Sequence, residues 1–363
     1  MGNGIRQELA NYKALDGLVH NQLAAIYLQE EIRRACSTRA KNLPVAGQSD
    51  RILHEEYAMN LDSIRHAVRA KGLTLASVVP EASAGRAEEA CIRLARVVEG
   101  TSLQMIPIGV AEAWPGSLAY LDGIQRSEII AYDGSAPILV AEIAAAVRER
   151  EDRRLHTVVK ARRKVALGRP SALAAAGDAL GELEAVPLPE DEPPHPLRDL
   201  VNAGHVLDQA RGALEVIVGD RYRAGSDGWL VLDGSLSVSP RWAEDPRMVA
   251  ISKSHSILPF DGADLEQYLR LPCAHRSSVY APATRSLAPV RAWGLRLWPW
   301  EGRDLLHGLV RVEVAPANES TERANQISRW ILAERAPVSA PDRRWDRLLY
   351  GIYSVEQYLK ARA

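Results

Sequence analysis

Two aspartates stand at the ends of apolar segments, and each is followed by glycine. Asp122 closes the segment LAYLD before Gly123, and Asp233 closes WLVLD before Gly234. A carboxylate at the end of a strand, with a glycine that lets the backbone turn away, is placed in a crevice at the carboxyl edge of a sheet. Because Asp-Gly after a strand is also a common plain turn, the order of the elements that carry the two aspartates decides their meaning.

The elements that carry the two aspartates follow one another in an order that points to one fold class. The apolar runs LQMIPIG, SLAYLDG, SEIIAYDG and PILVAEI predict consecutive strands, and Asp133-Gly134 indicates a hairpin. Asp122 falls on the first of three hairpin-connected strands. Asp233 falls on a strand that follows a long helix, predicted over residues 197–223. This is the order of the ribonuclease H-like fold, in which these two strands lie side by side and parallel. The sequence therefore predicts an α/β protein with such a mixed sheet flanked by helices.

The long helix supplies a third carboxylate. Glu215 would approach the two aspartates, although it could instead be an exposed residue paired with Arg211 four positions earlier. Asp208 is an alternative, but it lies about two turns away on the helix. Three convergent carboxylates cannot all stay ionised without a cation, and hard oxygen ligands suit Mg²⁺ or Mn²⁺. We expect Asp122, Glu215 and Asp233 to bind Mn²⁺ or Mg²⁺ for two-metal phosphoryl transfer.

Candidate phosphate contacts follow on the next strands. Lys253, after VAIS, could balance the carboxylates or hold a scissile phosphate, or could be a solvated lysine at a strand end. His255 lies two residues on and could assist phosphate binding or cap the turn. In GLVRVEVA, Arg311 could contact a DNA phosphate while Glu313 orients Arg311 or Lys253. A local Arg-Glu ion pair beside the core explains that strand equally well.

The chain divides into two predicted regions. Residues 1–100 are expected to be a helical N-terminal region for partner or dimer contacts, because apolar residues recur at helical spacing up to residue 35 and again over 54–70 and 84–98. Residues 101–363 are expected to form the ribonuclease H-like domain. Its insertion, about 144–197, should contain a basic helix over 144–163 and an acidic, proline-rich loop over 184–197. The cations of that basic helix are either a solvated face or a phosphate-binding one.

The remaining elements are read from the same patterns. The segments 228–232, 248–252, 292–298 and 308–314 are predicted as strands, and 321–334 and 342–362 as helices.

Composition narrows the function classes. The 363 residues carry 45 Lys+Arg against 46 Asp+Glu, a formal net charge of −1, so nucleic-acid contacts must come from local clusters. The three cysteines are far apart, which argues against a disulfide framework or a zinc knuckle. Neither a membrane span nor a signal peptide is found in the sequence, so we expect a cytoplasmic protein without membrane contacts.

The motif order resembles that of the NurA-type nucleases, which work beside the HerA-type hexameric ATPase in DNA-end processing and in some phage-defence operons. The resemblance spans roughly residues 118–363, and it rests on AYLDG, Glu215 followed by LVLDGSL, AISKSH, GLVRVEVA and PDRRWDRLLYGIYSVEQYLKA. It implies a metal-dependent DNA nuclease, usually a homodimer, with Mn²⁺ favoured. It assigns Asp122, Glu215 and Asp233 to the metal site. The partners it implies are DNA and a HerA-type ATPase.

The end of the chain departs from that family. Its members often carry an active-site histidine on the last helix, whereas no histidine follows His307 here. Asp346 and Glu356 are available for the fourth position, and either could equally be a solvated surface carboxylate.

Other classes are disfavoured by missing motifs. No P-loop or dinucleotide fingerprint occurs, no Glu-x-Lys strand of the PD-(D/E)-x-K nucleases occurs, and the serines after Asp233 lack the flanking glycine of a hydrolase elbow. The main alternative is a non-catalytic, nuclease-like adaptor that positions DNA or partners for an ATPase motor. An Argonaute-like nuclease lobe is less favoured, because no guide-binding domain is recognisable in the first hundred residues.

Overall fold

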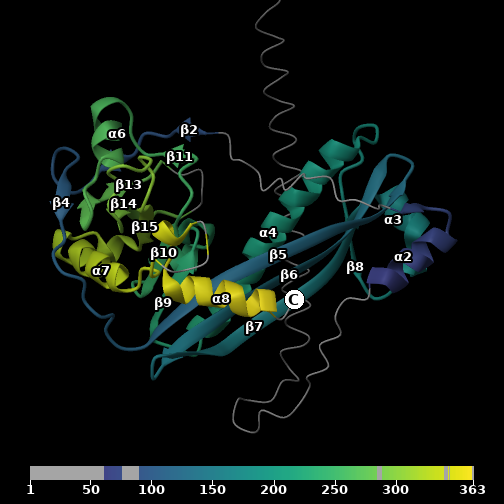
Figure 1. The fold of residues 1–363 in the computed structure, drawn as a ribbon, viewed down its shortest axis with the longest axis horizontal. Helices are drawn as coiled ribbons and strands as arrows, with labels where there is room; N and C mark the ends of the chain where they lie inside the picture. Colours follow the sequence, from purple (N-terminus) through teal and green to yellow (C-terminus); the bar gives the residue numbers. More distant parts are fainter. Residues whose placement is uncertain (1–60, 76–89, 284–287, 339–341, 343, 362–363) are drawn as a thin grey trace, which may run out of the picture.

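The computed structural model describes residues 61–75, 90–283, 288–338, 342 and 344–361. Within them one mixed sheet of 13 strands organises the molecule (Figure 1). The strands that build its centre are β5 (Leu118–Asp133), β6 (Ala136–Glu151), β7 (Arg154–Gly168), β9 (Trp229–Asp233), β10 (Met248–Ser252), β14 (Arg291–Arg296) and β15 (Leu309–Val314).

The strand order is the one that the sequence predicts for the fold class. β5, β6 and β7 form an antiparallel meander, whereas β9 pairs with β5 in parallel and β10 pairs with β9 in parallel. β15 and β14 extend the sheet in antiparallel pairs. The order β7-β6-β5-β9-β10 is that of the ribonuclease H-like fold, so the predicted α/β class with a mixed, helix-flanked sheet is confirmed.

Helices cover both faces of this sheet. α4 (Pro196–Arg223) packs an apolar stripe, including Leu207 and Leu214, against one face of β5, β6 and β7. α7 (Thr321–Ala333) and α8 (Tyr350–Ala361) cover the opposite face, where Ile327 and Val355 join the core. Because β9 and β10 are buried on both faces, they are nearly continuous apolar runs in the sequence.

Shorter elements complete the described structure. They are α2 (Leu61–Ala70), β1 (Thr74–Leu75), β2 (Cys91–Ile92), β3 (Arg96–Val97), β4 (Met105–Pro107), α3 (Pro170–Ala176), β8 (Glu184–Pro187), α5 (Pro240–Glu244), β11 (Ile257–Leu258), α6 (Gly262–Leu269), β12 (His275–Ser277), β13 (Tyr280–Ala281) and the 3-10 turns η1 (Gly177–Leu180), η2 (Leu236–Val238), η3 (Pro316–Asn318) and η4 (Trp345–Arg347). No helix in the described part of the chain has the length and apolar character needed to cross a bilayer.

The predicted basic helix over 144–163 is wrong. These residues lie in β6 and β7, which pair antiparallel over nearly their whole length. The alanine run lies in the part of β6 that is covered on both faces, where small side chains fit. Ala145 is buried toward α4 and Ala146 toward α8. From Arg154 to Arg163, β7 alternates exposed and half-buried residues, which is the period of a strand, and its last four residues are buried.

Three further expectations are corrected. SLAYLDG and SEIIAYDG belong to the single strand β5, which bends at a register shift between Ile129 and Ala131. Residues 90–98 of the predicted helix 84–98 contain β2 and β3. The last helix begins at Tyr350 rather than at residue 342, since η4 precedes it. The helices predicted before residue 61 lie outside the described residues, and α2 covers the end of the predicted helix 54–70.

Candidate functional site

Asp122 and Asp233 come from neighbouring parallel strands. The register of β5 with β9 ends at Leu121 opposite Leu232, so each aspartate is the next residue on its strand. Asp233 is the last residue of β9, but the expectation that Asp122 ends a strand is wrong, because β5 continues to Asp133 in its pairing with β6. Asp233 is in turn opposite Ile251 of β10. Parity along the strands places both aspartates on the face covered by α8. The convergence expected from the order of elements is therefore present.

The environment of Asp122 disfavours its charge. Burial raises the pKa of the Asp122 carboxyl well above its usual value, and the negative charges of Asp233 and Glu215 raise the pKa further. The positive charge of Lys253 opposes them. One Asp122 oxygen accepts a hydrogen bond of 2.8 Å from the backbone N–H of Gly123. A cation beside Asp122 would stabilise the ionised form that burial penalises.

Glu215 reaches the aspartates from α4, on the other face of the sheet. Its side chain lies directly against Gly123, where a Cβ would fall within 3.0 Å of both Cγ and Cδ of Glu215. Burial raises the pKa of Glu215, Arg211 opposes this shift, and the charge of Asp233 adds to it. Glu215 also forms an ion pair with Arg211. The expected pair with Arg211 is therefore present, but Glu215 is largely buried and not exposed, and its carboxylate lies beside β5 next to Asp122.

Asp208, the alternative carboxylate on α4, has a different partner. Its Oδ1 accepts a hydrogen bond of 2.8 Å from the side-chain amide of Gln125 on β5. Its charge contributes to the raised pKa of Glu215, so it belongs to the outer part of the same acidic region.

Lys253 supplies the positive charge at this edge of the sheet. Its Nζ lies 2.7 Å from Oδ2 of Asp233, and the two side chains are 12% and 27% exposed. The lysine therefore balances the carboxylates and is not an isolated, solvated side chain at a strand end.

Glu313 has a role that sequence reasoning missed. Its Oε2 accepts hydrogen bonds from the Ser235 hydroxyl at 2.6 Å and from the backbone N–H of Leu236 at 3.1 Å. These bonds fix the turn that follows Asp233. A glutamate inside the otherwise apolar strand β15 was the available signal, because a buried carboxylate needs polar partners.

Arg311 forms the local ion pair that was the alternative to DNA contact. Its Nε lies 3.1 Å from Oε1 of Glu313, and its side chain is mostly buried. The geometry therefore favours a structural role for Arg311.

His255 does not carry the charge that a phosphate contact would use. Its Nε2 is 2.8 Å from the carbonyl oxygen of Leu309. Burial lowers the pKa of His255 to about 4, so the ring is neutral at pH 7. The geometry gives no support to phosphate binding by His255.

The two C-terminal carboxylates lie in different places. Asp346 accepts a hydrogen bond of 2.7 Å from the backbone N–H of Gly308 and lies 3.5 Å from His307, so it ties the end of the chain to the loop before β15. Glu356, on α8, lies beside Arg344 and Lys360.

The charged residues near Asp122 fit a divalent cation by their chemistry, although they do not form a ready-made cage. In the part of the chain that the structure describes, no group of three His, Cys, Asp or Glu side chains is already arranged around a metal position. Lys253 and Arg211 instead neutralise Asp233 and Glu215. The donors are hard oxygens, and burial together with the neighbouring negative charges raises the pKa of Asp122 and of Glu215, which is the electrostatic situation that Mg²⁺ or Mn²⁺ relieves.

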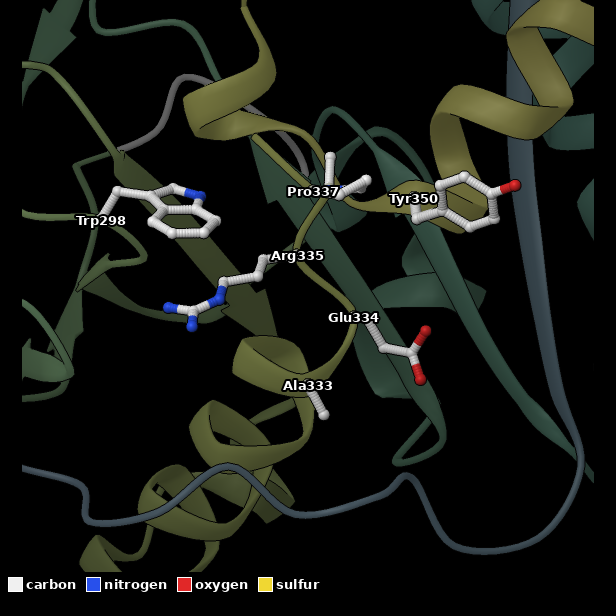
Figure 2. Close-up of a pocket in the computed structure, with 7 residues that line it drawn as sticks. Trp298, Ala333, Glu334, Arg335, Pro337 and Tyr350 are labelled. Carbon is white, nitrogen blue, oxygen red and sulfur yellow. The ribbon is translucent and has the colours of Figure 1, made fainter. Parts of the chain in front are cut away.

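A separate cavity of about 530 Å³ lies beside the start of α8 and contains none of the predicted site residues. Figure 2 shows Arg335 beside the indole of Trp298, and the guanidinium carbon lies 4.1 Å from the ring centroid. On the other side, Glu334 accepts a 2.6 Å hydrogen bond from the hydroxyl of Tyr120 and pairs with Arg150 at 2.7 Å. The hydrogen bond between Tyr120 and Glu334 therefore holds β5 to this wall of the pocket, two residues before Asp122.

Comparisons with known proteins complete the description of the site. No protein-family model matches the chain. No curated protein matches it. Among solved structures, the chain is similar to the crystal structure of the NurA nuclease from Sulfolobus solfataricus, with 10% identity, 70% of this chain and 81% of that chain covered, and a TM-score of 0.45. It is also similar to the catalytic domain of human endonuclease V, with 12% identity, coverage of 85% and 98%, and a TM-score of 0.27.

Proposed function

We propose that this protein is a metal-dependent nuclease that hydrolyses DNA phosphodiester bonds. The observation that carries the proposal is the cluster of Asp122, Asp233 and Glu215 beside the ammonium of Lys253. Burial and the charges of Asp233 and Glu215 raise the pKa of Asp122, and burial and the charge of Asp233 raise the pKa of Glu215. Perturbed carboxylates that meet at a sheet edge are typical of catalytic sites. DNA as the substrate is what the resemblance to the NurA-type nucleases implies.

The chain's own residues would divide the work as follows. Asp122 and Asp233 would hold Mn²⁺ or Mg²⁺, and Glu215 would complete the ligand set or orient a water. When bound, the cation supplies Lewis acidity that activates water and stabilises charge on the phosphate. Lys253 would stabilise negative charge on the scissile phosphate, because its Nζ already lies at the carboxylates.

We also propose the partners that the resemblance to the NurA-type nucleases implies. The protein would work as a homodimer with a HerA-type hexameric ATPase, in DNA-end processing or phage defence. Size measurement of the chain alone and after mixing with such an ATPase tests both associations.

Cleavage of linear and circular DNA by the full chain in Mn²⁺, in Mg²⁺ and in EDTA tests the activity. We expect metal-dependent loss of DNA that Asp122→Asn and Asp233→Asn each reduce by about 100-fold or more. Asp133→Asn is the matched control, because Asp133 also lies on β5 and precedes a glycine but is at the β5-β6 turn. Equal activity in all three variants would refute the assignment.

A second measurement does not depend on turnover. Mn²⁺ should raise the melting temperature of the wild-type protein, because a ligand that binds only the folded state stabilises it. The same addition should have little effect on Asp122→Asn or Asp233→Asn. An equal shift in all proteins would place the cation elsewhere.

The second candidate function is the non-catalytic adaptor. It is favoured by the ion pairs of Asp233 with Lys253 and of Glu215 with Arg211, which neutralise two of the carboxylates without a metal. If DNA stays intact even when the ATPase complex forms normally, and Mn²⁺ shifts no melting temperature, the adaptor replaces the nuclease.

A further inference from the structure

A second group of charged side chains comes from the C-terminal segment. Nε and Nη2 of Arg344 lie 3.2 Å and 3.0 Å from the two carboxylate oxygens of Asp342, and the Asp342 carboxylate also accepts a 2.8 Å bond from the backbone N–H of Arg344. Nη2 lies 3.4 to 3.5 Å from the oxygens of Glu356 on α8. Two carboxylates from different elements thus fix one guanidinium.

This group lies beside the candidate active site. The turn η4, which begins directly after Arg344, is held to the end of β10 by a 3.4 Å bond from Arg347 to the carbonyl oxygen of Lys253. The electrostatics agree with this placement. The pKa of Asp342 is lowered, first by its hydrogen bonds with Arg344 and also by the charge of Lys253. The pKa of Arg344 is raised, first by Asp342 and to a lesser extent by Glu356 and Asp233.

Two cations therefore lie at the end of β10, each in contact with carboxylate oxygens, and each is within electrostatic reach of the other's carboxylate partner. Lys253 is bound to Asp233, and Arg344 is bound to Asp342 and Glu356. The Lys253 side chain is largely buried, whereas 45% of the Arg344 side chain is exposed. An anion that approaches from solvent can meet Arg344 first, and the planar guanidinium suits two-point contact with phosphate oxygens.

We propose that Lys253 and Arg344 together form a phosphate subsite that binds a backbone phosphodiester of DNA at the candidate active site. This inference rests on the proposed function and adds a residue and a ligand to it. Asp342 and Glu356 are the positioning residues of the subsite, because they fix the guanidinium before DNA arrives. A pre-oriented side chain loses less conformational freedom on binding.

The competing explanation is structural. Arg344 could only neutralise Asp342 and Glu356, in which case its removal would act through the two carboxylates that it leaves unpaired. The two explanations differ in what happens when one of those carboxylates is removed as well.

The test is equilibrium binding of a short, fluorescently labelled single-stranded DNA to the full chain in EDTA, followed by anisotropy over a series of salt concentrations. We expect Arg344→Gln to weaken binding about tenfold, as the loss of one charge-assisted contact does. It should also reduce the slope of log affinity against log salt by about 0.7 to 1. Arg241→Gln is the matched control, because Arg241 is an exposed arginine on α5 paired with Asp220.

The double variant Arg344→Gln, Glu356→Gln separates the two explanations. If Arg344 binds phosphate, the second substitution restores neither affinity nor slope. Three outcomes would overturn the subsite. The double variant could regain the DNA affinity of the wild type, Arg344→Gln could bind DNA as tightly as the wild type, or Arg241→Gln could lose as much affinity as Arg344→Gln. Absence of DNA binding by the wild type would overturn it as well. Because EDTA removes the metal, the binding result does not depend on cleavage. Cleavage is tested separately, by the metal series and by the Asp122→Asn and Asp233→Asn variants.

Discussion

A Cβ at position 123 would lie 3.0 Å from both Cγ and Cδ of Glu215 and still closer to its carboxylate oxygen. The missing side chain of Gly123 is therefore what lets a carboxylate from α4 reach strand β5 next to Asp122. The second residue of the Asp-Gly pair has a steric role at the site, and it forms no turn, because β5 continues through it.

Gly123→Ala should separate stability from activity. Since the clashing atoms belong to a flexible glutamate, we expect a small loss in the free energy of unfolding, about 1 to 2 kcal/mol. The displaced carboxylate should reduce cleavage of DNA by about 10- to 100-fold. Denaturant unfolding and steady-state cleavage measure the two effects.

The control is Gly212→Ala on the same helix as Glu215, where a Cβ meets nothing within 4 Å. It should keep full activity and gain up to about 1 kcal/mol from helix propensity. Full activity of Gly123→Ala would show that the position of Glu215 is irrelevant to the reaction.

Asp122→Asn should stabilise the metal-free protein at neutral pH. Burial raises the pKa of Asp122 in the folded state, so the folded protein binds more protons than the unfolded chain above pH 4. Wild-type stability should therefore fall as the pH rises from about 4 through the raised pKa of the folded state. The Asn variant should lack this contribution, and its side-chain oxygen can still accept the Gly123 bond.

Urea unfolding of both proteins in EDTA at several pH values tests this expectation. A less stable Asn variant at pH 8 would indicate that the Asp122 charge has a stabilising partner in the folded protein.

His255 should give the opposite pH dependence. Its pKa is lowered by burial to about 4, below the unfolded value of about 6.5, so its contribution to stability is lost as the pH falls through this range. The full contribution is up to about 3 kcal/mol for a shift of this size. His255→Gln should remove that slope from the acid side of the stability curve. The DNA affinity of His255→Gln at pH 7 should equal that of the wild type. A slope of log affinity against log salt reduced by about one charge would contradict the conclusion that the His255 ring is neutral.

Glu313 should act on the reaction through Asp233. Glu313→Ala leaves Ser235, Leu236 and Arg311 without their carboxylate partner in a buried site, and we expect a loss of about 3 to 5 kcal/mol in stability. The loosened turn should also weaken Mn²⁺ binding. Glu313→Gln keeps an acceptor for the turn and should lose less in both measurements.

Titration with Mn²⁺, followed by its paramagnetic resonance, reports the binding directly. Glu319→Ala, which removes the exposed partner of Arg291, is the control and should change stability by less than about 1 kcal/mol. Equal Mn²⁺ affinity in Glu313→Ala and wild type would limit Glu313 to a structural role.

Local patterns in the sequence determined much of the fold. β10 has the predicted bounds, and β9, β15, α4 and α7 match within one or two residues. Asp233 ends its strand as expected, whereas Asp122 lies inside β5. These elements have strong apolar periodicity or clear end signals, which depend on neighbouring residues alone. The order of elements then implied which strands lie side by side.

Tertiary structure decided the rest. The run of alanines and arginines in β6 and β7 has helical propensity. It forms strands because β6 pairs with both β5 and β7, and such packing overrides weak local preferences. The same holds for contacts distant in sequence. Glu313 lies 78 positions from Ser235, and Arg347 lies 94 positions from Lys253. Such contacts depend on how whole elements pack, so the local pattern could identify the two aspartates but not the residues that hold and surround them.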